Sequence, residues 1–124
     1  MQNEKKHILI VDDIPMNIKV LSQSLRDDYT VTFATGGKEA LDRIKASPPD
    51  LILLDVMMPD MDGFEVCKRL KADETTQHIP IIFLTAKQDV EDAIKGLTLG
   101  GDDYVIKPFD AEKVKSLIKK RLSP

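Results

Sequence analysis

Short apolar runs alternate along the chain with stretches in which apolar residues recur every three or four positions. The runs are rich in branched and aromatic side chains, and they cover residues 8–11, 31–34, 51–54, 80–84 and 104–106. Runs of this length, bounded by polar or glycine-containing segments, predict the strands of a largely buried sheet.

Each apolar run is followed by a segment with helical periodicity. The apolar positions are Ile18, Leu21 and Leu25; Ala40, Leu41 and Ile44; Phe64, Cys67 and Leu70; Val90, Ile94 and Leu97; and Val114, Leu117, Ile118 and Leu122. Such spacing places the apolar residues on one face of a helix. Strands that alternate strictly with helices are joined by right-handed parallel crossovers. We therefore predict an α/β doubly wound fold, with a five-stranded parallel sheet and helices on both faces.

Composition narrows the class of protein. With 42% hydrophobic and 31% charged residues among 124, the chain is globular, and its length suits one domain over residues 1–124. The apolar runs are far too short to cross a bilayer, and the chain starts without an apolar signal segment. We expect a cytoplasmic protein that does not associate with membranes.

The charge distribution argues against direct binding to nucleic acid. The net charge is −3, and the basic residues are scattered except for Lys119, Lys120 and Arg121. We expect these three to form the solvated last turn of a helix, where cations are favoured. Cys67 is the only cysteine, which excludes a disulfide framework, and its apolar neighbours predict a buried side chain.

Polar side chains that can bind ligands or take part in reactions stand at the ends of four predicted strands. Asp12 and Asp13 follow the first strand, Asp55 the third, Thr85 the fourth and Lys107 the fifth. In parallel α/β sheets, ligands bind beyond the carboxyl ends of the strands. We therefore expect these five side chains to meet at one edge of the sheet.

The charges at this edge call for a cation. Two carboxylates about 5 Å apart repel each other by about 3 kcal/mol at an effective dielectric constant near 20. Lys107 supplies one positive charge, and a set of oxygen ligands without His or Cys suits Mg²⁺. A divalent ion beside an aspartate, a hydroxyl and an ammonium is typical of phosphoryl-transfer sites.

Two other kinds of site are excluded by spacing. Residues 36–39, Gly-Gly-Lys-Glu, lack the upstream glycine and the following Ser or Thr of a nucleotide-binding P-loop. Residues 60–63, Asp-Met-Asp-Gly, would place Met58 and Arg69 at the first and last positions of a calcium loop. Asp60 and Asp62 are better explained as turn and helix-start residues.

Four separated motifs resemble the receiver domain of two-component response regulators, in the same order and over nearly the whole chain. They are ILIVDD, LILLDVMMPDMDGFEVCKRL, IPIIFLTA and GGDDYVIKPF. The resemblance implies a flavodoxin-like sheet with strand order 2-1-3-4-5. It also implies a signalling phosphoacceptor that catalyses only its own phosphorylation and dephosphorylation.

The resemblance assigns a role to each residue at the sheet edge. Asp55 would accept a phosphoryl group from a sensor histidine kinase or a phosphotransfer protein. Asp13, Asp55 and the backbone carbonyl of Met57 would bind Mg²⁺, while Asp12 would orient a water of the metal. Lys107 would pair with carboxylate or phosphoryl oxygens.

The resemblance also implies a conformational switch. Thr85 would donate its hydroxyl to the phosphoryl group, and Tyr104 would move inward when Thr85 does. The face made by the fourth helix, fifth strand and fifth helix would then signal to an output domain or a downstream protein. The Lys107–Pro108 peptide bond is expected to be cis. Gly101 stands where receivers more often have Ala, and we expect little consequence because both residues are small.

Two alternatives share parts of this chemistry. A Mg²⁺-dependent phosphatase or phosphotransferase would use Asp13 and Asp55 on an external substrate, but only a short loop separates Asp55 from the next helix, which leaves no cap to enclose one. A pseudo-receiver would keep the fold without phosphorylation. The presence of all five acidic, hydroxyl and ammonium residues argues against it.

Overall fold

A computed structural model describes residues 5–108 and 110–122 and shows strands and helices in strict alternation. The strands are β1 (His7–Val11), β2 (Thr30–Ala34), β3 (Leu51–Asp55), β4 (Ile81–Thr85) and β5 (Asp103–Ile106). The helices are α1 (Pro15–Leu25), α2 (Gly37–Ala46), α3 (Gly63–Lys71), α4 (Val90–Thr98) and α5 (Ala111–Leu122), and the short 3₁₀ helix η1 (Lys87–Asp89) precedes α4. All strands pair in parallel, in the order β2-β1-β3-β4-β5. The predicted fold class and sheet order are confirmed.

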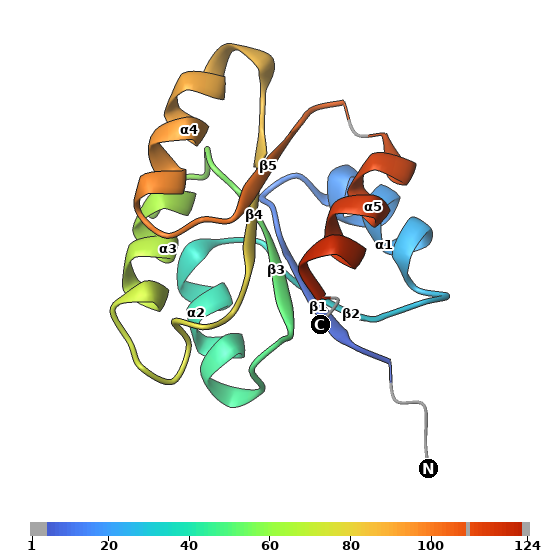
Figure 1. The fold of residues 1–124 in the computed structure, drawn as a ribbon, viewed down its shortest axis with the longest axis horizontal. Helices are drawn as coiled ribbons and strands as arrows, with labels where there is room; N and C mark the ends of the chain where they lie inside the picture. The colour runs from blue at the N-terminus through green and yellow to red at the C-terminus, as the bar shows by residue number, and fades with distance from the viewer. Residues whose placement is uncertain (1–4, 109, 123–124) are drawn as a thin grey trace.

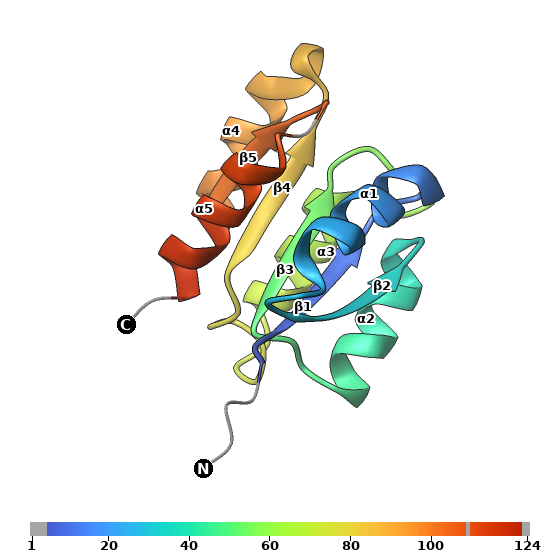
Figure 2. The same cartoon turned by 90° about the vertical axis from the view of Figure 1, so that its right-hand side faces the viewer.

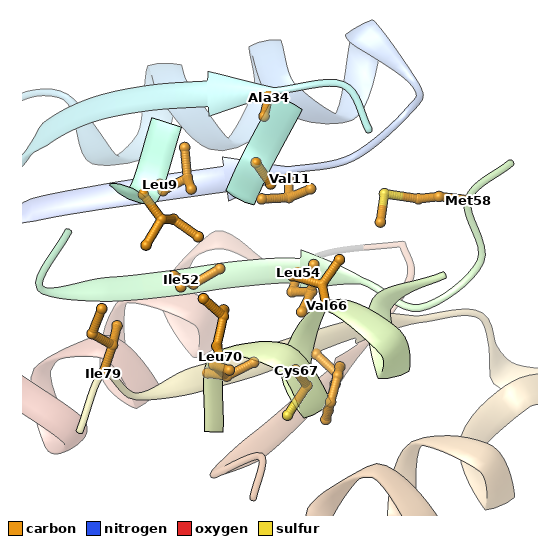
Figure 3. Close-up of a cluster of buried hydrophobic side chains, with 14 of the residues drawn as sticks. Leu9, Val11, Ala34, Ile52, Leu54, Met58, Val66, Cys67, Leu70 and Ile79 are labelled. Atoms are coloured by element: carbon orange, nitrogen blue, oxygen red, sulfur yellow. The ribbon is translucent and has the colours of Figure 1, made fainter. Parts of the chain in front are cut away.

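The sheet is the middle of three layers. Helices α1 and α5 cover one face, and α2, α3 and α4 cover the other (Figure 1 and Figure 2). Successive side chains of a strand point to opposite faces, so Leu9 and Val11 pack beneath α2 and α3 while Ile8 and Ile10 pack beneath α1 and α5. Figure 3 shows the first of these two clusters, in which Cys67 is fully buried as predicted.

The helical periodicity identifies the core residues of four helices and is less accurate for α4. Ile94, predicted to lie in the core, is 49% exposed. The reason is that Gly96 turns inward instead: a Cβ atom at this position would lie 2.6 Å from the ring of Phe64 and 2.7 Å from that of Phe83. These two rings pack edge to face with centroids 5.4 Å apart. The backbone of α4 at Gly96 therefore packs directly against the rings of Phe64 and Phe83.

The expectation for Gly101 is wrong. A Cβ atom there would collide with the ring of Phe83, a fully buried residue of β4. Protein interiors are close-packed, so even one added methyl group must displace its neighbours. The absence of a side chain at Gly101 therefore makes room for Phe83 at the base of α4.

Arg121 is not the solvated residue that the charge pattern predicts. Its Nη2 donates to the carbonyl of Asp102 at 2.6 Å and lies 3.7 Å from the carboxylate of Asp103. Asp102 in turn accepts a hydrogen bond from the backbone N–H of Ile81 at 2.8 Å. The last turn of α5 is therefore fastened to the start of β5.

Within residues 5–108 and 110–122, none of the helices has both the length and the apolar character needed to cross a membrane.

Candidate functional site

The carboxyl ends of the central strands bring the predicted site residues together. Asp55 and Thr85 are the last residues of β3 and β4, while Asp12 and Lys107 directly follow β1 and β5. The parallel register pairs Asp55 with Leu84 and Thr85 with Ile106, so the strand ends lie level. The backbone N–H of Lys107 also donates to the carbonyl of Thr85 at 2.8 Å.

Three carboxylates form a compact acidic cluster at this edge. Carboxylate oxygens of Asp12, Asp13 and Asp55 lie within 4.8 Å of one another. Asp12 is fully buried and Asp55 is 3% exposed, whereas Asp13 is half-buried at the rim. An all-oxygen set of this kind fits a hard divalent cation such as Mg²⁺ and does not suit softer transition metals.

A glycine lets the neighbouring loop close against the acidic cluster. A Cβ atom at Gly63 would collide with the backbone carbonyl of Asp55, and the N–H of Gly63 donates to the carbonyl of Val56 at 2.8 Å. Asp62 caps α3 by accepting from the backbone N–H of Glu65 at 2.9 Å, which confirms its predicted place at a helix start.

Lys107 is the cationic partner of the cluster. Its Nζ lies 3.1 Å from Oδ1 of Asp55 and 3.4 Å from Oδ2 of Asp12. The peptide bond between Lys107 and Pro108 is cis, as expected. One ammonium thus faces two buried carboxylates.

The positive charge of Lys107 does not fully compensate the buried negative charges of Asp55 and Asp12. Burial, the most important cause, and the nearby Asp12 carboxylate raise the pKa of Asp55 to about 7, against the opposing effect of Lys107. A carboxylate with a raised pKa is one whose negative charge lacks full compensation. A further cation at this position would favour the ionised form of Asp55, so the electrostatics agree with the ligand chemistry.

The acidic cluster opens to solvent through a cleft of about 430 Å³. Its lining includes Asp13, Asp55, Thr85 and Lys107, together with Met57, whose side chain is exposed. The hydroxyl of Thr85 donates to the carbonyl of Ala86 at 3.2 Å. A small anion entering the cleft could therefore reach a carboxylate, a hydroxyl and an ammonium.

Several residues of the site were missed by sequence reasoning. Asn17 donates from its side-chain amide to Oδ2 of Asp12 at 3.1 Å. Gln88 and Asp89 line the cleft from the segment that precedes α4. The signal for Asn17 was its place in the first turn of the helix that follows the paired aspartates; nothing in the sequence marked Gln88 or Asp89.

Tyr104, the expected switch residue, is half-buried and packs against the apolar cluster beneath α2, α3 and α4. It lies on β5 opposite Phe83 of β4. Its movement, and the ligand role of the Met57 carbonyl, stay predictions.

The chain is similar in sequence to curated response regulators. It is 48% identical over 104 residues to the response regulator PleD of Caulobacter vibrioides, which covers 83% of this chain and 23% of PleD. It is 44% identical over 115 residues to the alkaline phosphatase synthesis transcriptional regulatory protein PhoP of Bacillus subtilis, covering 92% of this chain and 47% of PhoP. The chain thus spans less than half the length of these relatives.

Structure and family comparisons agree with the sequence matches. The solved structure of the Vibrio cholerae chemotaxis protein CheY4 matches with a TM-score of 0.88 and 31% identity, covering 95% of this chain and 99% of that chain. The family described as the response regulator receiver domain matches residues 8–119, which include the acidic cluster, Thr85 and Lys107. With fold, site and sequence all in agreement, the chain belongs to the response regulator receiver domains of two-component systems.

Proposed function

We propose that Asp55 is the residue on which this receiver accepts a phosphoryl group, from a sensor histidine kinase or a phosphotransfer protein. An oxygen of the Asp55 carboxylate bonds to phosphorus, the P–N bond of the phosphohistidine breaks, and the leaving imidazole takes up a proton. The observation that carries this assignment is the position of Asp55 in the cleft, with the Lys107 ammonium 3.1 Å from its Oδ1. The product is an acyl phosphate.

The residues around Asp55 fit Mg²⁺, and we assign Asp13, Asp55 and the backbone carbonyl of Met57 as its ligands. Asp12 would support the ion through a water, as the family resemblance implies, while its two oxygens also accept hydrogen bonds from Ile14 and Asn17. A bound Mg²⁺ would supply positive charge to the carboxylates and to the oxygens of the incoming phosphoryl group.

Lys107 and Thr85 carry the remaining charge and hydrogen bonding. Phosphorylation of Asp55 adds roughly one negative charge and new acceptor oxygens. Lys107 is positioned to pair with these oxygens. The Thr85 hydroxyl, which now donates to the Ala86 carbonyl, would turn to donate to the phosphoryl group. Tyr104 then repacks toward the space that Thr85 leaves, and a local charge change becomes a change of surface.

The surface that changes is the face formed by α4, β5 and α5, which an output domain or a downstream protein would read. Ile94 of α4 and Ile106 of β5 are 49% and 37% exposed, so apolar side chains on this face are available for contact with a partner. In this proposal residues 1–124 act as one receiver domain, with catalysis limited to their own phosphorylation and dephosphorylation.

Intact-mass spectrometry after incubation with acetyl phosphate and Mg²⁺ tests the acceptor. The wild-type chain should gain the mass of one phosphoryl group, and Asp55→Asn should gain none. Asp60→Asn is the matched control, since Asp60 is an exposed aspartate in the loop after β3. Full phosphorylation of Asp55→Asn would reject Asp55 as the acceptor.

A further inference from the structure

Asp12 has both of its carboxylate oxygens engaged by donors of this chain. Oδ1 accepts from the backbone N–H of Ile14 at 2.9 Å, and Oδ2 accepts from the side-chain amide of Asn17 at 3.1 Å. Oδ2 also lies 3.4 Å from Nζ of Lys107. Because Asp12 is fully buried, bulk solvent does not compensate for a donor that is lost.

Lys107 is shared between two acidic partners. Its Nζ is slightly closer to Asp55, at 3.1 Å, than to Asp12, at 3.4 Å. A lysine ammonium is a point charge on a flexible stem, so it moves toward whichever carboxylate is less well satisfied. The hydrogen bonding of Asp12 therefore influences how much of the Lys107 charge reaches Asp55.

We infer that Asn17 is a positioning residue that holds Lys107 for Asp55 by satisfying Asp12. Asn17 is the third residue of α1, and its backbone N–H donates to the carbonyl of Ile14 at 3.0 Å, which places its amide in the first turn. An amide donates to Asp12 without adding charge to the cluster. When this donor is absent, Asp12 draws Lys107 toward itself and away from Asp55.

The effect on phosphorylation rests on the proposed function of Asp55; the effect on Lys107 does not. Asn17→Leu keeps the branched shape of the side chain and removes the donor, and we expect about tenfold slower phosphorylation by acetyl phosphate, the usual size for a hydrogen bond to a charged group. Asn17→Gln keeps an amide and should recover part of the rate. Met16→Leu, a conservative change at the neighbouring exposed residue, is the control.

A double-mutant cycle separates positioning from general damage to the fold. If Asn17 acts through the charge of Asp12, Asn17→Leu should change the rate by less than about twofold in an Asp12→Asn background. An equal slowing in both backgrounds, or no slowing in the wild-type background, would overturn the inference.

The position of Lys107 can be followed without phosphorylation. In protein labelled with ¹⁵N-lysine, the Nζ resonance of Lys107, assigned by its loss in Lys107→Arg, should shift in Asn17→Leu and stay in place in Met16→Leu. An unshifted resonance in a folded Asn17→Leu variant contradicts the inference.

Asn17→Ser, whose hydroxyl is too short to span the contact, serves if Asn17→Leu does not fold. A wild-type chain that gains no phosphoryl group from acetyl phosphate would reject the proposed function. It would leave the NMR result on Lys107 unaffected.

Discussion

Nζ of Lys107 lies 3.1 Å from Oδ1 of Asp55, although the two residues are 52 positions apart in the sequence. The sheet order brings the two residues close together. Strand β4 lies between β3, which ends at Asp55, and β5, which Lys107 follows, and the three strands end at the same level. The same ammonium lies 3.4 Å from Asp12. Lys107 is therefore both an electrostatic partner of the acidic cluster and a donor aimed at the proposed acceptor.

Replacing Lys107 by Met should slow phosphorylation of Asp55 by about 10- to 100-fold, because the charge opposite the incoming oxygens is lost while the length of the side chain is kept. The pKa of Asp55 should also rise above its present value of about 7, since Lys107 lowers it. Phosphorylation kinetics and carboxyl ¹³C NMR measure the two effects. Lys107→Arg is the control for charge. A pKa of Asp55 that does not change in Lys107→Met would contradict the ion pair between the two side chains.

Stability should depend on pH through Asp55. Its folded-state pKa of about 7 lies above the ordinary value of 3.8, so between these two values the folded chain holds a proton that the unfolded chain has released. The free energy of unfolding contributed by Asp55 therefore falls as the pH rises through this window, and stays low above pH 7. We expect Asp55→Asn to be more stable than the wild type by about 2 kcal/mol at pH 8, and by much less at pH 4.

Urea unfolding in the presence of EDTA, at several pH values, measures this difference. Added Mg²⁺ should narrow it, because a bound cation stabilises the ionised wild-type site. A stability gap between the two proteins that is the same at pH 4 and pH 8 would be inconsistent with a raised pKa at Asp55.

Asp13 and Thr85 should differ sharply in their effect on cation binding. Asp13 belongs to the acidic cluster, whereas Thr85 lines the cleft without adding charge. We expect Asp13→Ala to weaken Mg²⁺ binding by about tenfold or more, and Thr85→Ala by less than about twofold. Calorimetric titration gives both values. Equal losses would show that the roles of the two residues have been assigned wrongly.

Gly101→Ala should destabilise the fold by about 1–3 kcal/mol, because its methyl group must displace the buried ring of Phe83. Chemical denaturation measures the change. The loss should shrink in a Phe83→Leu background, where the space is available. If Gly101→Ala costs the same in both backgrounds, the collision with Phe83 is not its cause.

The strands and the acidic cluster could be predicted from the sequence because each depends on a local pattern. An apolar run that ends in a polar residue marks the end of a strand, and parallel strands place those ends at one edge of the sheet. The structure differs from the prediction at Asp55 and Thr85 in one detail. Each was expected to follow its strand directly, and each is the last residue of that strand.

Features that depend on packing between distant segments were harder to predict. Periodicity assigned Ile94 to the core because it cannot show that a glycine, Gly96, lets α4 approach two aromatic rings. The charge pattern placed Arg121 in solvent, because it cannot show that Asp102 and Asp103, the partners of this residue, lie at the start of β5. Asn17 was overlooked for a similar reason: its function comes from the direction of its amide relative to Asp12, which is fixed only when α1 has formed.

Asp13 follows β1 and Asp55 ends β3, so a cation bound by both residues would link its binding to folding. An unfolded chain keeps these carboxylates far apart and has little affinity for a divalent ion, so an ion that binds at the sheet edge favours the native state. At a free concentration about a hundred times the dissociation constant, such a ligand adds about 2.7 kcal/mol to the free energy of unfolding. Under the proposed function, the ion that relieves the charge repulsion of the acidic cluster is also the ion that supports phosphorylation of Asp55, so stability against unfolding would report how far the site is loaded with that ion.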